Sequence, residues 1–269
     1  MVLLSRCSYS FCLLFSLLAS TSRLSWAFRV SLPKEQEKQK NKMALRVLCL
    51  PGWRTNKSIL SDQLDLAGFR SFYGDILEFV CIDGTFDAEG EPTPDVKQIW
   101  PTGPYFQWWT IDDAQKGPKT YHGAEKSVDR VASILKEEGP FQGILGFSQG
   151  ACLTNLIAAK KCSGDKRFED ISFVIPCSGF IPRDPDMAPL FETPLQIPSL
   201  HVAGEKDQLF PASVDAVSKY DSSTSLFIQH PGGHSLPRLP EAERTKFRGF
   251  LVKLLNGGGG TQAAGSSSL

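Results

Sequence analysis

The stretch Gly143-Ile144-Leu145-Gly146-Phe147-Ser148-Gln149-Gly150-Ala151 decides how this chain folds. Apolar residues from 141 to 147 predict a buried strand, and the apolar residues that follow Gly150 predict a helix. Ser148 therefore occupies the apex of a sharp strand-to-helix turn, where a strained backbone makes its hydroxyl project outward. Glycine fits the two flanking positions, Gly146 and Gly150, because a side chain there would clash with the neighbouring strand and helix.

Two later strand-like runs each lead to a candidate partner for Ser148. Residues 197–203 run into a loop that carries Asp207, and residues 225–229 run into a glycine-rich loop that carries His234. Parallel strands present their carboxyl ends at one edge of a sheet, so we expect the three side chains to meet there. Imidazole can take the serine proton near neutral pH, and a buried acid fixes its tautomer. The order predicts a Ser148–Asp207–His234 triad for nucleophilic catalysis.

Two other carboxylates compete with Asp207 for the acidic position. Glu205 begins the same loop too early, and Asp215 falls within a helix expected from residue 211. Each of these acids, taken alone, is equally well explained as a surface charge or a capping group. Asp207 is favoured because its placement agrees with those of Ser148 and His234.

The chain has 4 histidines, which leaves few candidates for the base. His201 lies inside an expected strand, where a packed or hydrogen-bonded core role fits better. His122 precedes Ser148 and breaks the chain order of nucleophile, acid and histidine. His230 ends a strand and remains the rival of His234, whose loop is better suited to direct the ring at the serine.

The tetrahedral intermediate of acyl transfer needs two backbone N–H donors. One is expected from Gln149, at the start of the helix, where free amides and the helix dipole favour an anion. The other is expected from Trp53, in the loop 51–56 after the strand predicted at residues 45–50, with Gly52 allowing close backbone approach. An ordinary strand-to-helix turn is the alternative interpretation of this Pro-Gly loop.

Five segments that carry these motifs together resemble a known family. They resemble the family of serine hydrolases that includes the ovarian-cancer-associated serine hydrolase and fungal thioesterase-like relatives, within the α/β-hydrolase superfamily. The resemblance covers about residues 44–255. It implies hydrolysis of carboxylic esters or thioesters by the three triad residues. Pro51 stands where the family usually has histidine, which is not a triad member, so we expect activity to survive. The segments are 48–54, 143–151, 177–180, 198–207 and 232–234.

Strand-like and helix-like segments alternate along the chain, which predicts an α/β fold. Together with the resemblance, the pattern predicts an α/β-hydrolase: a mostly parallel central sheet of about six strands flanked by helices, in one domain from residue 43 to 255. Strands are expected near residues 45–50, 77–82, 141–147, 171–177, 198–203 and 224–229, and helices near 57–67, 122–138, 149–161, 211–220 and 238–255.

A proline- and aromatic-rich insertion from residue 84 to 119 interrupts this alternation. An irregular segment of this length in a compact domain is uncommon unless it has a function. We expect a lid or pocket wall that offers apolar surface to an acyl group, while packing that seals the loop remains an equal alternative. A second interruption at residues 179–197 could form the opposite wall. The expected substrate-binding residues are Trp100, Tyr105, Phe106, Trp108 and Trp109.

Composition excludes several other classes of function. Lys and Arg total 29, as do Asp and Glu, so the charge balance gives no reason to expect nucleic acid or an anionic membrane as a partner. The histidines and cysteines lack metal-ligand spacing, and no phosphate-binding loop precedes a helix, so neither a metal nor a cofactor is expected. Cys49, Cys81, Cys152 and Cys177 are expected to be buried free thiols without a disulfide framework.

The two ends of the chain differ from the domain between them. Residues 1–42 combine basic residues with an apolar run too short to span a bilayer and a small-x-small cleavage pattern, so no stable membrane anchor is expected. This leader predicts the secretory pathway or, as a bipartite presequence, a complex plastid; a start at Met43 would instead give a cytoplasmic protein. The tail 256–269 is rich in Gly and Ser and is expected to be disordered.

The sequence as a whole predicts a serine esterase or thioesterase acting on small-molecule or acyl-chain substrates through an acyl-enzyme. A non-catalytic ligand-binding protein on the same fold is the alternative, because fold does not imply function. Such a protein would lack or displace a member of the triad, whereas all three residues are present here.

Overall fold

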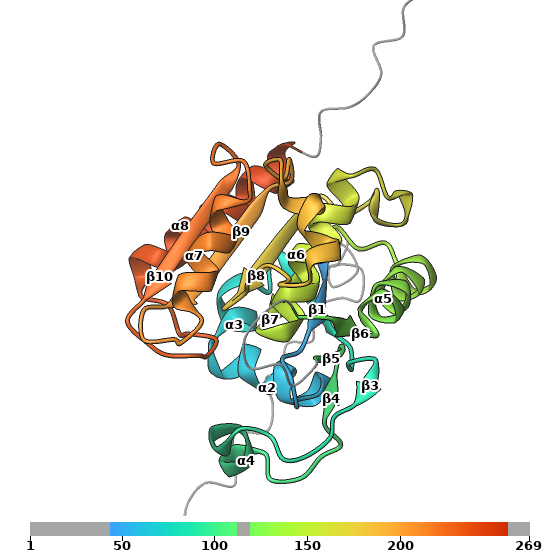
Figure 1. The fold of residues 1–269 in the computed structure, drawn as a ribbon. Coiled ribbons are helices and arrows are strands. Elements are labelled where there is room, and N and C mark those ends of the chain that lie inside the picture. Colours follow the sequence, from blue (N-terminus) through green and yellow to red (C-terminus); the bar gives the residue numbers. More distant parts are fainter. Residues whose placement is uncertain (1–43, 112–118, 258–269) are drawn as a thin grey trace, which may run out of the picture. The chain divides into compact units, whose positions relative to one another are not determined.

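The computed structural model describes residues 44–111 and 119–257, so the expected leader and nearly all of the expected tail lie outside the described residues. Six strands form one parallel sheet in the order β10-β9-β8-β7-β1-β2 (Figure 1). This is the predicted sheet. The strands are β1 (Leu45–Leu50), β2 (Leu77–Cys81), β7 (Gly143–Phe147), β8 (Phe173–Cys177), β9 (Ser199–Gly204) and β10 (Ser225–His230).

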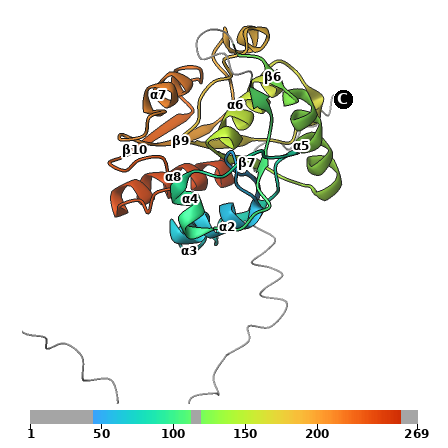
Figure 2. The same cartoon turned by 60° about the horizontal axis from the view of Figure 1, so that its bottom comes forward.

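Helices cover both faces of the sheet. Figure 2 shows α5 (Ala124–Glu138), α6 (Gln149–Cys162) and α7 (Phe210–Ser218) over one face. The other face carries α2 (Lys57–Leu66), α3 (Phe69–Tyr73) and α8 (Glu241–Gly257). Two short 3-10 helices, η1 (Lys166–Phe168) and η2 (Pro185–Phe191), accompany α6.

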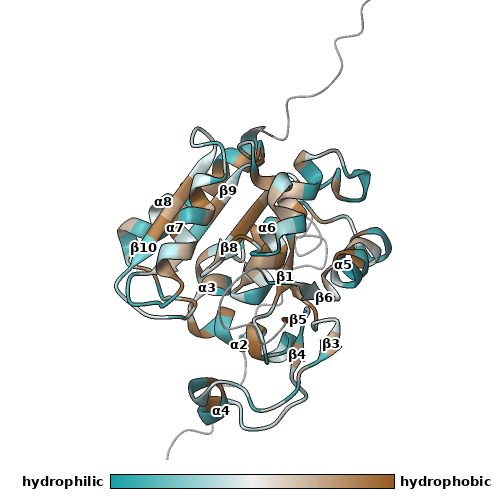
Figure 3. Ribbon diagram, viewed as in Figure 1, coloured by the Kyte–Doolittle hydropathy of each residue, from teal (hydrophilic) through white to brown (hydrophobic). Residues whose placement is uncertain are grey.

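Each face of the sheet has its own apolar core, and alternate residues of the strands divide between them. In β1, Leu48 and Leu50 belong to the core on the side of α6, whereas Val47 and Cys49 belong to the core on the side of α8. Burial on both faces explains why the strands read as continuous apolar runs. Figure 3 shows this as brown strands, with hydrophilic teal on the outer turns of α5.

Helix α6 is buried along almost its whole length. Every residue from 149 to 159 is buried, because the sheet, α5 and the two 3-10 helices surround it. The predicted core positions Leu153, Leu156 and Ile157 are all completely shielded from solvent. The helix that follows Ser148 is therefore fixed from several sides, which gives the serine a rigid support.

The insertion contains short elements that sequence periodicity did not predict. Strand β3 (Phe86–Asp87) pairs with β4 (Phe106–Gln107), and β5 (Thr110–Ile111) pairs with β6 (Tyr121–His122), both antiparallel. Helix α4 (Pro94–Ile99) lies between β3 and β4 in the chain. The β3–β4 pair continues one step further, since the N–H of Ala88 donates to the carbonyl of Tyr105 at 2.9 Å. Residues 112–118 lie outside the described residues.

The thiols largely follow the expectation. Cys49, Cys152 and Cys177 are buried and free, whereas Cys81 is only partly buried. Burial raises the pKa of each of the three buried thiols, so they behave as small apolar side chains. Within residues 44–111 and 119–257, no helix is long and apolar enough to cross a bilayer.

Candidate active site

The serine elbow has the strained backbone that its sequence predicted. Ser148 joins β7 to α6 with φ 55° and ψ −114°, a conformation that side-chain-bearing residues rarely adopt. A Cβ on Gly146 would collide with the carbonyl of Gly150, and a Cβ on Gly150 would collide with the carbonyl of Leu50. The Ser148 N–H donates to the carbonyl of Cys177 in β8 at 3.0 Å. Both glycines are therefore required by close backbone approach, as expected.

Ser148, His234 and Asp207 form a continuous hydrogen-bonded row. The Nε2 atom of His234 lies 2.9 Å from Ser148 Oγ, and its Nδ1 lies 2.7 Å from Asp207 Oδ2. An ionised carboxylate can only accept, so Nδ1 carries the proton and Nε2 is left to accept from the serine hydroxyl. The Asp207 side chain is 1% exposed and that of His234 is 37% exposed, so the acid is shielded from solvent while the imidazole faces the pocket. The structure brings together the three residues that the sequence selected.

The loops that carry Asp207 and His234 are hydrogen-bonded to each other. Glu205 N–H donates to the carbonyl of His230 at 2.8 Å, and Lys206 N–H donates to the carbonyl of Gly232 at 3.0 Å. A Cβ on Gly204 would collide with carbonyl oxygens of the histidine loop, so glycine permits this contact. Asp207 itself is held because its other carboxylate oxygen accepts from the Leu209 N–H at 2.8 Å.

The competing residues lie elsewhere. His230 is buried at the end of β10, and its burial lowers the pKa of the ring. His201 is buried in β9, where desolvation lowers its pKa to about 3 and keeps it neutral, as expected for a core histidine. His122 lies in β6, just after the insertion. Glu205 and Asp215 are both exposed to solvent.

The two amides expected to bind an oxyanion have no hydrogen-bond acceptor among the described residues. Within the described residues, neither the Trp53 N–H nor the Gln149 N–H donates a hydrogen bond. Gly52 places the Trp53 loop against the serine, because a Cβ there would lie 3.4 Å from Ser148 Cβ. Free amides beside the serine hydroxyl are what an oxyanion requires.

The side chains of Trp108 and Gln149 hold this arrangement together. Trp108 Nε1 donates to the carbonyl of Pro51 at 2.8 Å, at the start of the Trp53 loop. Gln149 Oε1 accepts from the Trp108 N–H, and Gln149 Nε2 donates to the Trp109 carbonyl, both at 3.0 Å. Sequence reasoning missed this role for the Gln149 side chain, since no local pattern indicates such distant partners.

The structure corrects the expectation for two of the aromatic residues of the insertion. Trp108 is 0% exposed and Trp109 is 1% exposed, and both pack into the α6-side core rather than lining the pocket. Trp109 stacks on Tyr121 with ring centroids 5.1 Å apart. Large aromatic surfaces gain most from complete burial, and the Trp108 indole N–H also donates to a carbonyl, so the core is the favourable place for Trp108. The indole N–H of Trp109 is buried without a hydrogen-bond partner among the described residues, so apolar packing and the stack on Tyr121 hold that side chain.

A pocket of about 260 Å³ opens at Ser148 and His234. Trp100 lines it as expected, but Tyr105 and Phe106 do not, and the second interruption at residues 179–197 contributes no wall. Leu66 of α2 and Ile99 of α4 are 64% and 59% exposed, a sign of unfilled apolar surface that sequence reasoning missed. The apolar lining residues are Trp53, Leu66, Val96, Ile99, Trp100, Phe147 and Leu236.

Asp95 supplies a fixed negative charge to this pocket. It is the one acidic side chain among the residues that line the pocket. A hydrogen bond from Thr93 lowers the pKa of the Asp95 carboxyl, and the neighbouring His234 acts in the same direction. The carboxylate therefore stays ionised near neutral pH, close to the imidazole and the apolar walls. No cluster of three or more His, Cys, Asp or Glu side chains suited to a metal occurs in the described part of the chain.

A parallel sheet with a strained serine elbow after β7, and with an acid and a histidine in the loops after β9 and β10, defines an α/β-hydrolase. The chain belongs to the serine hydrolase (FSH1) family, whose model matches residues 41–245. It is 36% identical over 214 residues to esterase OVCA2 of Bos taurus, covering 72% of this chain and 89% of the relative. Human esterase OVCA2 is 34% identical with the same coverage.

Solved structures agree on the fold. The crystal structure of a single-substitution variant of SOBER1 from Arabidopsis thaliana matches with a TM-score of 0.53 at 19% identity, covering 79% of this chain and 99% of that one. The crystal structure of esterase PE8 matches with a TM-score of 0.52 at 18% identity, covering 78% of this chain and 92% of that one. At this level of identity the likeness concerns the α/β-hydrolase fold alone.

Proposed function

We propose that this protein hydrolyses carboxylic esters or thioesters of small or acyl-chain substrates through a Ser148–His234–Asp207 triad. The observation that carries the proposal is the unbroken row of hydrogen bonds from Ser148 Oγ through His234 to Asp207. Serine hydroxyl is a weak nucleophile until a base takes its proton, and this row supplies the base and its orienting acid.

In the first half of the reaction, His234 Nε2 accepts the serine proton while Ser148 Oγ attacks the acyl carbonyl carbon. The oxyanion that forms is bound by the free N–H groups of Trp53 and Gln149. The imidazolium is stabilised by the buried Asp207 carboxylate. It then protonates the departing alcohol or thiol, leaving an acyl group on the serine.

In the second half, water replaces the leaving group. His234 takes a proton from that water, which attacks the acyl carbonyl, and the same two amides bind the second oxyanion. Return of the proton to Ser148 Oγ releases the carboxylic acid. The same groups serve both halves of the reaction, so no further catalytic residue is required.

The pocket supports an apolar acyl group as the part of the substrate that is recognised. Its walls are mostly apolar, and Leu66 and Ile99 offer exposed surface that an acyl chain would cover. Covering such surface is favourable by about 25 cal/mol per Å². The negative charge of Asp95 disfavours acyl groups that themselves carry a carboxylate.

A fluorophosphonate probe and a set of acyl esters test the proposal. We expect stoichiometric labelling of the wild type, none of Ser148→Ala, and normal labelling of Ser58→Ala, which removes an exposed hydroxyl from α2. Turnover of a short acyl ester should fall by about 10⁶ in Ser148→Ala and about 10⁴ in Asp207→Asn. Wild-type turnover in Ser148→Ala would refute the proposal, and a wild type inert to probe and esters would indicate a binding protein.

Leaving-group chemistry is resolved by matched substrates. Oxygen esters and thioesters with the same acyl group, from two to sixteen carbons long, separate the acyl preference from the leaving-group preference. Because deacylation is common to both series, equal kcat values with different kcat/KM values would place the discrimination in acylation.

A further inference from the structure

A second and larger cavity lies at the end of the sheet opposite the serine. It is a groove of about 790 Å³ between α8 and the residues at the start of β8, β9 and β10. Ser148 follows the carboxyl end of β7, whereas Ser172, Pro198 and Thr224 precede the amino ends of their strands. The two cavities share no lining residue. The groove is therefore a separate site.

One face of α8 forms a wall of the groove. Lys246, Gly249, Phe250, Lys253 and Leu254 recur at the spacing of a single helix face and all line it. The adjacent face of α8 carries Phe247 and Leu251, which are completely buried in the α8-side core. Phe250 and Leu254 lie at the edge of this packed face, where they are only partly buried and leave apolar surface open to the groove.

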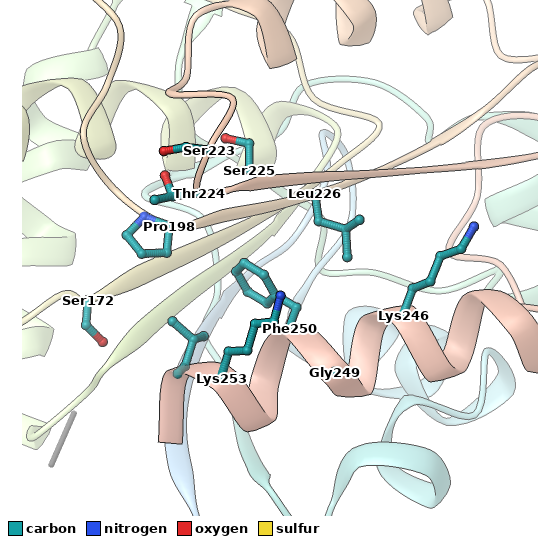
Figure 4. A pocket seen from close by; sticks show the side chains of 11 residues that line it. Ser172, Pro198, Ser223, Thr224, Ser225, Leu226, Lys246, Gly249, Phe250 and Lys253 are labelled. Carbon is teal, nitrogen blue, oxygen red and sulfur yellow. The ribbon is translucent and has the colours of Figure 1, made fainter. Parts of the chain in front are cut away.

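The floor of the groove is apolar and its rim is polar. Figure 4 shows Leu226 from β10 and Phe250 from α8 pointing toward one another, with Ser223, Thr224 and Ser225 gathered above them. Leu226 and Phe250 are only partly buried against the core. An apolar trough with a few hydroxyl groups at one end is typical of a small-molecule site, and the volume falls within the usual range of roughly 300–1,000 Å³.

Gly249 enlarges the groove at some cost to the helix. It stands in the interior of α8, where glycine is less favourable than alanine. A Cβ at this position would meet nothing within 4 Å, so close packing does not require the glycine. What its missing side chain provides is open space beside Phe250.

The charge of the lining is positive. Lys246 and Lys253 line the groove and no acidic residue does. Lys246 is paired with Glu243 at 2.8 Å, whereas Lys253 forms no ion pair within residues 44–111 and 119–257. The Lys253 ammonium is therefore available to an anionic head group beside an apolar floor.

We propose that this groove binds a free long-chain fatty acid, with the chain between Phe250 and Leu226 and the carboxylate at Lys253. Apolar walls accept the chain, the ammonium and the nearby hydroxyl groups accept the head, and the open space at Gly249 admits the chain beside the helix. The site does not depend on the proposed hydrolysis, since none of its residues belongs to the Ser148 pocket. It would bind a fatty acid whether or not this protein produces one.

Equilibrium binding of the fluorescent fatty acid cis-parinaric acid to the full chain tests the site. We expect Lys253→Glu to weaken binding by roughly tenfold or more, as loss of a charge-assisted contact does. Lys126→Glu, a matched exposed lysine on α5, should bind as the wild type does. Gly249→Phe should fill the groove and abolish binding. Gly249→Ala should retain binding and raise the thermal midpoint of unfolding, and that result would show that α8 tolerates a side chain at this position.

Four results would overturn the proposal. Unchanged binding in both Lys253→Glu and Gly249→Phe would place the fatty acid elsewhere. Equal competition by an uncharged fatty alcohol of the same length would remove the role assigned to Lys253. Binding that appears only after removal of residues 258–269 would indicate that these C-terminal residues occupy the groove in the full chain. Sedimentation with phosphatidic acid vesicles that depends on Lys253, without competition by monomeric fatty acid, would indicate a membrane surface instead.

Fatty-acid binding and ester hydrolysis are measured independently, so each proposal can fail without the other. If Ser148→Ala abolishes turnover and cis-parinaric acid binding is unchanged by Gly249→Phe, the groove proposal fails while the proposed function stands. If binding follows the groove variants but no ester is cleaved, the proposed function fails while the groove proposal stands.

Discussion

Both halves of the insertion are rich in aromatic residues, but they lie in different parts of the fold. The first half, residues 84–105, carries α4 and lines the pocket at Ser148, with Ile99 59% exposed. The second half, residues 106–119, places Trp108 and Trp109 in the core, where they are hydrogen-bonded to the Trp53 loop and to Gln149. An aromatic-rich insertion can therefore both cover a pocket and hold in place the Trp53 loop, which carries one of the two proposed oxyanion donors.

Trp108→Ala is the sharpest test of this division. It removes a fully buried indole, so the free energy of unfolding should fall by about 3–5 kcal/mol. It also removes the hydrogen bond to the Pro51 carbonyl, which holds the Trp53 loop in position. Because the Trp53 N–H would then no longer be fixed beside the oxyanion, kcat of the folded protein should fall roughly a hundredfold. Urea unfolding and ester turnover measure the two effects.

Trp108→Phe separates packing from hydrogen bonding at the same position. It retains most of the apolar volume but cannot donate to Pro51. We expect a smaller stability loss than in Trp108→Ala with a comparable loss of kcat. Normal kcat in both variants would mean that the second half of the insertion stabilises the fold but does not position the Trp53 loop for catalysis.

Trp100→Ala should behave in the opposite way to Trp108→Ala. Trp100 lies in the pocket wall and donates from Nε1 to the exposed Asp62 carboxylate at 2.8 Å, so its loss should cost no more than about 1 kcal/mol in stability. KM for an acyl ester should rise roughly tenfold, because part of the apolar wall is removed. A large fall in kcat with unchanged KM would contradict a binding role for the first half.

Asp95→Asn should give the smallest effect, confined to charge selectivity. Removing the carboxylate should raise the ratio of kcat/KM for a succinyl half-ester to kcat/KM for a butyryl ester. The expected rise is about fivefold, which corresponds to one screened charge–charge interaction. The pKa of Asp95 is lowered from 3.8, so the group is ionised throughout pH 5–8. The discrimination should therefore be constant from pH 6 to 8. It should weaken as the pH falls toward about 4.3, the pKa of an ordinary side-chain carboxyl, because the succinyl group is protonated before Asp95. Discrimination that changes between pH 6 and 7 would assign it to another group.

The sequence predicted the sheet and the central residues of the candidate site because both have local signatures. The strands are apolar runs, and Ser148, Asp207 and His234 each follow one. Helix α3 was not predicted from the sequence, because the five residues between Gly68 and Gly74 are too few to display helical periodicity. Its single turn is held by packing of Phe69 and Tyr73 in the α8-side core.

The pocket walls were less predictable, because distant segments create them. Leu66 and Leu236 both line the pocket, although they belong to opposite ends of the domain. Trp100 and Trp108 are the same residue type in one insertion, but the indole of Trp108 has a buried acceptor in the distant Pro51 carbonyl, whereas that of Trp100 donates to the exposed Asp62. Local composition identifies apolar surface, but tertiary contacts determine which part of that surface is buried in the core.

The short β3–β4 ribbon brings together the two ends of the covering module, residues 89–104. Phe86 and Asp87 pair with Gln107 and Phe106, and Ala88 bonds to Tyr105, so the module begins and ends at the same place. Hydrogen bonds from Trp100 to Asp62 and from Asn56 to Pro104 hold it against α2. Loops whose ends are clamped together accept changes of length and sequence at low entropic cost. Natural divergence or laboratory exchange of this module could retune the acyl group that is accepted while the chemistry beneath stays intact.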